Sequence, residues 1–70
     1  MTKLGEYLAK RSVNKSEVAR RTGLSKARVS ELTLNETTKL SAKELYLIAL
    51  AINIDPCELQ RHLYGDLQLS

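Results

Sequence analysis

A chain of 70 residues is long enough for one small domain, which buries only ~60% of its extended surface. It has no Trp, no Phe and a single cysteine, Cys57. Neither an internal disulfide nor a thiolate metal site is therefore expected, and we expect the protein to work in a reducing, intracellular compartment. No segment is apolar for long enough to cross a bilayer, and the first residues lack the apolar stretch of a signal peptide.

The net charge of +3 is distributed unevenly. Residues 1–30 carry eight basic and two acidic side chains, a net charge of +6, whereas residues 31–70 carry three basic and six acidic ones, a net charge of −3. A polyanion is therefore expected to meet the N-terminal half. Charge alone leaves two interpretations open, which are nucleic-acid binding and a solvated surface of uneven composition.

Capping residues predict five helices, at residues 2–11, 15–22, 26–33, 42–52 and 56–64. The first is the weakest, because Gly5 lies inside it and only Thr2 marks its start. Polar residues followed three positions later by an acid predict capping boxes at Asn14–Glu17, Ser41–Glu44 and Asp55–Glu58, and Ser25 is a further N-cap. The residues predicted to end helices in the left-handed conformation are Gly23, Asn53 and Gly65, with Asn35 as a fourth candidate.

The segment from Leu45 to Ile52 is apolar or aromatic throughout, which is typical of a helix buried on more than one side. One predicted core face consists of Leu45, Ile48, Ala49 and Ile52. The side chains expected to turn toward another helix or a partner subunit are Tyr46, Leu47 and Leu50.

Residues 15–34 place two short helices about three residues apart, at Thr22-Gly23-Leu24. So tight a turn needs a residue that tolerates positive φ, which Gly23 does, and the close crossing needs a small side chain, for which Ala19 is suited. The apolar residues predicted to hold the pair against the rest of the domain are Val18, Leu24, Val29 and Leu32. This is the spacing of a helix-turn-helix, whose second helix enters the major groove of DNA.

The motifs Val18-Ala19, Thr22-Gly23-Leu24-Ser25 and Val29-Ser30 resemble the Cro/C1-type (XRE-like) helix-turn-helix family. The resemblance extends to roughly residues 3–63 through Ile48-Ala49, Ala51-Ile52-Asn53-Ile54 and Asp55-Pro56-Cys57-Glu58-Leu59. It implies an all-α fold, a compact five-helix bundle of the lambda repressor-like kind. Residues 1–70 are then one domain with its helix-turn-helix unit at 15–34.

The resemblance also implies a bacterial or phage regulator of transcription that works in the cytoplasm. It is expected to bind double-stranded DNA as a homodimer on a palindromic operator, most simply as a repressor, with activation left open. The residues expected at base edges are Lys26, Ala27, Arg28 and Ser30, with Arg28 directed toward bases or backbone. Those expected at phosphates are Asn14, Lys15, Ser16, Arg20 and Ser25.

Four positions depart from the family pattern. Lys15 stands where glutamine is frequent, Thr33 where an acidic residue is frequent, and Asn35 where glycine is frequent. Glu31 falls near the expected DNA-facing side, where it can accept a hydrogen bond from cytosine or repel phosphate.

Catalysis is not expected, because the chain has one His, one Cys, no glycine-rich phosphate loop and no metal-ligand spacing. No cofactor, metal or small-molecule ligand is expected either. The alternative function is that of an antitoxin or another protein-interaction module, and an RNA-binding module comes third. The C-terminal residues 65–70 are expected to be either a frayed end or a dimer contact, since Tyr64, Leu67 and Leu69 follow the last clear helical stripe.

Overall fold

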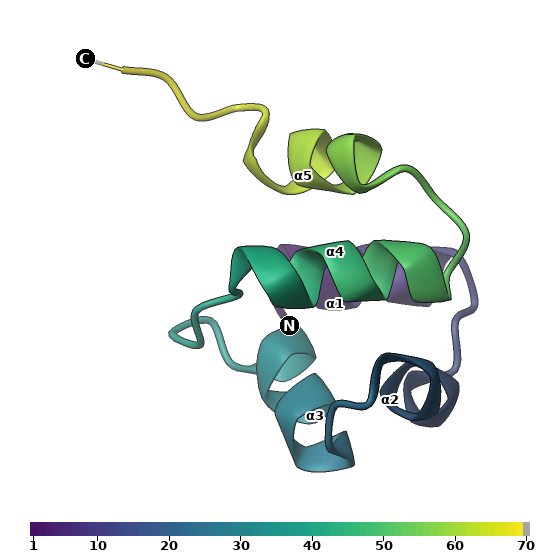
Figure 1. Cartoon of the computed structure of the whole chain (residues 1–70). Helices are drawn as coiled ribbons and strands as arrows, with labels where there is room; N and C mark the ends of the chain where they lie inside the picture. Colours follow the sequence, from purple (N-terminus) through teal and green to yellow (C-terminus); the bar gives the residue numbers. More distant parts are fainter. Residues whose placement is uncertain (70) are drawn as a thin grey trace.

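The computed structural model describes residues 1–69, which form five α-helices (Figure 1). The helices are α1 (Lys3–Lys10), α2 (Lys15–Thr22), α3 (Lys26–Leu34), α4 (Ala42–Ala51) and α5 (Pro56–Tyr64). The radius of gyration is 11.5 Å, near the ~11 Å expected for a compact chain of this length. The predicted all-α fold is confirmed, and each predicted helix boundary lies within one residue of the observed one.

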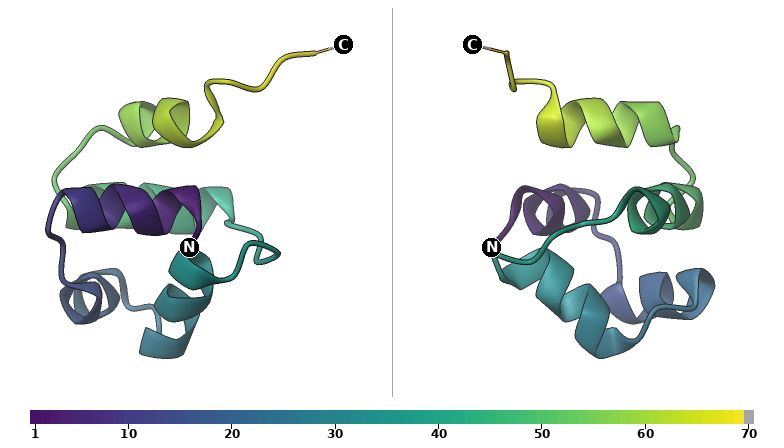
Figure 2. Two further views of the ribbon diagram at one scale, coloured as in Figure 1. Left: turned by 180° about the vertical axis from the view of Figure 1, so that it is seen from behind. Right: turned by 60° about the vertical axis from the view of Figure 1, so that its left-hand side comes forward.

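The helices are arranged in layers. α1 and α4 lie side by side in the middle, α2 and α3 cover one side of them, and α5 covers the other (Figures 1 and 2). The segment that follows α5 runs away from the body of the domain. The pair α2–α3 and the C-terminal segment therefore lie on opposite sides of the molecule. Ser70, the last residue of the predicted tail, lies outside the described residues.

The core consists of apolar side chains that meet between these layers. The buried members are Leu4, Tyr7, Leu8, Val18, Ala19, Val29, Leu32, Leu45, Ile48, Ala49, Leu59 and Leu63, and the partly buried ones are Val13, Leu24, Leu40, Ile52 and Ile54. Full burial of one such aliphatic side chain contributes about 1.5–3 kcal/mol. The predicted core face of α4 is observed, because Ile48 and Ala49 are buried. Tyr46 and Leu50, which are predicted to turn away from it, are about half exposed, at 50% and 53%.

All five helices begin at a polar side chain that accepts a hydrogen bond from a first-turn amide, as predicted. These N-caps are Thr2, Asn14, Ser25, Ser41 and Asp55. Of the three predicted capping boxes, the one at Ser41–Glu44 is complete, whereas at Asp55 the side chain accepts from the Cys57 N–H and no box with Glu58 forms. At Asn14 the predicted box is only half formed, because the Glu17 carboxylate accepts from Arg20 and Arg21 instead. Charge-assisted bonds to guanidinium groups are stronger than a bond from a neutral backbone amide.

The helix ends follow the prediction at two positions and depart from it at two others. Gly23 and Asn53 have the predicted positive φ, at 80° and 60°. The prediction is wrong at Gly65, which is right-handed with φ −66° because its N–H still bonds to the Arg61 carbonyl as in a continuing turn. It is also wrong at Asn35, where the chain leaves α3 in an extended conformation with φ −97° and ψ 111°.

The start of α1 is docked on the end of α3. The Thr2 N–H donates to the Thr33 carbonyl at 3.0 Å, and the Thr2 hydroxyl donates to the Leu32 carbonyl at 2.8 Å. Two carbonyls at the C-terminus of α3 thus find partners outside their own helix. Gly5 permits this approach, because a Cβ at that position would overlap the Thr33 carbonyl oxygen. The glycine that weakens α1 as an isolated helix is therefore required by its packing.

Candidate nucleic-acid interface

The connection between α2 and α3 is three residues long and is fixed by local hydrogen bonds. Gly23 has φ 80°, and nothing lies within 4 Å of the position that a Cβ would take, so its backbone conformation alone requires glycine. The Thr22 hydroxyl donates to the Val18 carbonyl at 2.7 Å and accepts from the Leu24 N–H at 3.2 Å. This threonine therefore ties the turn to the last turn of α2. No sequence signal predicts this role for Thr22.

The apolar residues of the α2–α3 pair are placed where a rigid unit needs them. Val18, Ala19, Val29 and Leu32 are buried, and Leu24 is partly buried against the same core. α2 also packs on α4, and α3 on α1, so both helices are held by the middle layer as well as by each other. A site built on such a scaffold keeps its exposed side chains in fixed relative positions.

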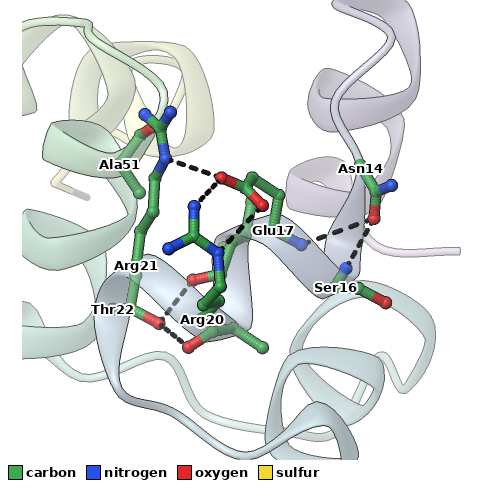
Figure 3. Close-up of polar contacts among 9 residues, drawn as sticks. Asn14, Ser16, Glu17, Arg20, Arg21, Thr22 and Ala51 are labelled. Atoms are coloured by element: carbon green, nitrogen blue, oxygen red, sulfur yellow. Dashed lines mark hydrogen bonds and ion pairs between the residues drawn. The ribbon is translucent and has the colours of Figure 1, made fainter.

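The N-terminus of α2 presents an amide and a hydroxyl to solvent. Asn14 Oδ1 accepts from the Ser16 N–H at 2.8 Å and from the Glu17 N–H at 3.4 Å (Figure 3). Because the oxygen is turned toward the helix, the Asn14 NH₂ group is the part left to act as a donor. Ser16 is exposed beside it and Lys15 is half-buried. The positive end of the helix dipole lies behind these residues and favours an anion.

Two arginines share one carboxylate on α2. Glu17 accepts from Arg20 through both carboxylate oxygens and from Arg21 Nε at 3.1 Å (Figure 3). These bonds, the one from Arg20 first, hold the pKa of Glu17 below its ordinary value. Arg21 also donates to the Ala51 carbonyl at 3.1 Å and so joins α2 to the end of α4. Two positive charges against one negative leave the cluster cationic, and the Arg20 side chain is 69% exposed.

A surface groove between α2 and the start of α3 gathers several of the predicted contact residues. Its lining consists of Asn14, Ser16, Glu17, Ala19, Arg20, Leu24 and Lys26. Four of these residues are predicted DNA contacts, and they share one surface: Asn14, Ser16, Arg20 and Lys26. Ala19 and Leu24 form the apolar part of this lining.

The exposed side of α3 carries three of the four predicted base-contacting residues. Lys26, Ala27 and Ser30 are exposed, as is Glu31. Ser25, a predicted phosphate contact, caps the helix, and its Oγ accepts from the Arg28 N–H at 3.0 Å. The helix thus offers one cation, one methyl group and one hydroxyl toward a ligand, with one carboxylate beside them.

Arg28 is placed differently from the other predicted base-contacting residues. Its Nε donates to Glu44 Oε2 at 2.6 Å, and its Nη2 donates to Glu44 Oε1 at 2.9 Å and to the Lys39 carbonyl at 3.0 Å. The hydrogen bonds from Arg28 lower the pKa of Glu44 to about 2, and the same contact raises the pKa of Arg28. The spacing of Ser41 and Glu44 predicts Glu44 as a capping residue. No sequence signal relates it to Arg28, which lies 16 positions away.

The electrostatic polarity of the sequence matches the layers of the fold. The cationic cluster and Lys26 lie on α2 and α3, whereas Asp55 and Glu58 belong to the start of α5 on the opposite side (Figure 1). Within residues 1–69 no group of three potential metal-ligating side chains occurs, and no helix there is long and apolar enough to cross a membrane. Because of these cationic side chains, the α2–α3 side is the surface on which a polyanion is expected to bind.

Two short helices that share an apolar scaffold and are joined through a left-handed glycine turn define a helix-turn-helix unit. Residues 3–62 match the Cro/C1-type HTH DNA-binding domain, and the chain belongs to that family. It is therefore a DNA-binding domain. Among curated proteins and solved structures, nothing matches the chain.

Proposed function

We propose that this protein is a sequence-specific regulator of transcription that binds double-stranded DNA through α3. The observation that carries the proposal is the arrangement of Lys26, Ala27 and Ser30 on the exposed side of α3, next to a groove that gathers Asn14, Ser16 and Arg20. Side chains on such a helix read base edges in the major groove, while donors flanking it bind phosphates and fix the register. The helix-turn-helix unit spans residues 15–34 of a single domain.

The base contacts follow from side-chain chemistry. Lys26 can donate to guanine O6 and N7, the Ala27 methyl can contact the methyl group of thymine, and Ser30 can donate or accept. The proposed phosphate contacts are Asn14, Lys15, Ser16, Arg20 and Ser25. Arg20 contributes through its exposed guanidinium, although Glu17 neutralises part of its charge.

The functional unit in this proposal is a homodimer on a palindromic operator. Two recognition helices related by a two-fold axis read half-sites about one helical turn apart. Apolar side chains away from the α2–α3 side are available for a second subunit, since Leu67 is 72% exposed and Tyr64 41% exposed. Occupying a promoter in this way blocks polymerase, so repression in the bacterial cytoplasm is the simplest outcome.

Selection of binding sites from a random duplex library, at near-physiological salt, tests this function. A symmetric site with half-sites about ten base pairs apart is expected. A promoter that carries the recovered site, placed before a reporter, then gives the sign of regulation. Recovery of no site, with only weak salt-sensitive binding, would instead support a protein-interaction role such as that of an antitoxin.

A further inference from the structure

The ion pair between Arg28 and Glu44 joins the recognition helix to α4. Arg28 forms two hydrogen bonds to the carboxylate, at 2.6 and 2.9 Å, and a third to the Lys39 carbonyl at 3.0 Å. The side chain of Glu44 is only 12% exposed and that of Arg28 is 35% exposed. Three of the five guanidinium N–H groups are thus directed toward the protein itself.

The carboxylate is held in place independently of Arg28. Glu44 Oε1 accepts from the Ser41 N–H at 3.0 Å, and the Glu44 N–H donates to Ser41 Oγ at 3.1 Å. This capping box fixes Glu44 at the first turn of α4, and α4 is anchored in the core through Leu45 and Ile48. Arg28 therefore meets an acceptor whose position is set by the fold.

Moving Arg28 to DNA would be costly. A phosphate or a guanine would have to replace two charge-assisted bonds and would leave a mostly covered carboxylate without its cation. The same displacement would add a second free cation to α3, which carries no basic residue other than Lys26 and Arg28. Lys26, with no such partner among its contacts in the described residues, needs no displacement to reach DNA.

We propose that Glu44 is a specificity-determining positioning residue, which holds Arg28 against α4 and keeps it out of the DNA contacts. The inference rests on the proposed DNA-binding function and refines its contact set. Lys26, Ala27 and Ser30 then read bases, while Arg28 fixes the angle between α3 and α4. A free arginine on α3 would add affinity for phosphates at any DNA sequence. By holding Arg28, Glu44 therefore preserves the difference in affinity between the operator and other DNA.

The salt dependence of DNA binding separates these roles. The logarithm of the binding constant falls with the logarithm of salt concentration with a slope of about −0.9 per phosphate neutralised, which can be followed between about 50 and 200 mM salt. Four proteins are compared: the parent, Glu44→Gln, the double variant Arg28→Met with Glu44→Gln, and Lys26→Ala. Each is titrated with the duplex recovered by selection and with a duplex of unrelated sequence, and circular dichroism verifies that each is folded.

The double variant is the matched control, because it removes the pair without leaving an unpaired charge and keeps an aliphatic side chain at position 28. Its slope is expected to equal that of the parent. Glu44→Gln is expected to steepen the slope by about 0.9 and to bind the unrelated duplex more tightly, by several-fold, because Arg28 is released. Lys26→Ala is expected to bind the selected duplex about 5- to 150-fold more weakly.

A double variant whose slope is shallower than that of the parent by about 0.9 would show that Arg28 already contacts DNA and would overturn the inference. Equal slopes in the parent and in Glu44→Gln would overturn it as well. If Glu44→Gln does not fold, the comparison of the double variant with the parent decides alone. If the parent binds neither duplex, the proposed function fails and this inference fails with it, an outcome distinct from a change in slope.

Discussion

Replacing Gly5 by alanine sets helix propensity against packing in α1. In an exposed helix the change stabilises by about 1 kcal/mol, because alanine loses less conformational entropy than glycine. Here the new Cβ overlaps the Thr33 carbonyl oxygen, a backbone atom that cannot rotate away. Overpacking of this kind costs about 1–3 kcal/mol. Separation of the helices also weakens the 3.0 Å bond from the Thr2 N–H to that carbonyl, a further cost of about 1 kcal/mol.

The net expectation is that Gly5→Ala lowers the free energy of unfolding by about 1–3 kcal/mol. For a domain of this size the melting temperature then falls by roughly 5–20 °C. Urea unfolding followed by circular dichroism gives the free energy, and Ala9→Gly supplies the control. Ala9 is exposed in the same helix, so that variant measures propensity alone. A Gly5→Ala protein as stable as the parent, or more stable, would refute the docking of α1 on α3.

Three further predictions concern the core, the interface and pH. Ala19→Leu is expected to lower the free energy of unfolding by about 1–3 kcal/mol in thermal denaturation, because Ala19 is only 5% exposed beside the α2–α3 groove. Lys26→Ala is expected to weaken binding to the selected duplex by about 1–3 kcal/mol in a fluorescence titration, through loss of a base contact. The pKa of Glu44 is about 2 in the folded state, below its ordinary 4.5, because Arg28 donates to it. Its contribution to stability is therefore complete above pH 4.5 and is lost as the pH falls toward about 2, so the difference in unfolding free energy between the parent and Glu44→Gln should shrink over that range.

Each of these has an opposing result. An Ala19→Leu variant that melts with the parent would contradict the close approach of α2 and α3. Unchanged affinity and unchanged sequence preference in Lys26→Ala would remove that residue from the base contacts. A stability difference for Glu44→Gln that does not vary between pH 4.5 and about 2 would contradict the depressed pKa of Glu44.

The amino-acid sequence by itself determined where the helices are and that two of them form a helix-turn-helix. Each N-cap accepts from an amide two or three residues ahead, as Ser41 does from Glu44, and the left-handed turn needs only the backbone freedom of Gly23. Such interactions involve neighbours within one helical turn, so their residue types can be recognised without knowing the fold. The same locality made the exposed side of α3 predictable.

Only the tertiary structure decided which distant groups meet. Gly5 lowers the helix propensity of α1, yet the packing requires it, because the Thr33 carbonyl oxygen lies where a Cβ would be. Arg28 reads as a free cation on α3, yet Glu44 accepts from it across 16 residues of sequence. Both pairs depend on the positions and angles at which helices cross, and these are set by the packing of the whole core. A capping rule describes the start of a helix, whereas the environment of an exposed or buried side chain is fixed only after the helices have packed.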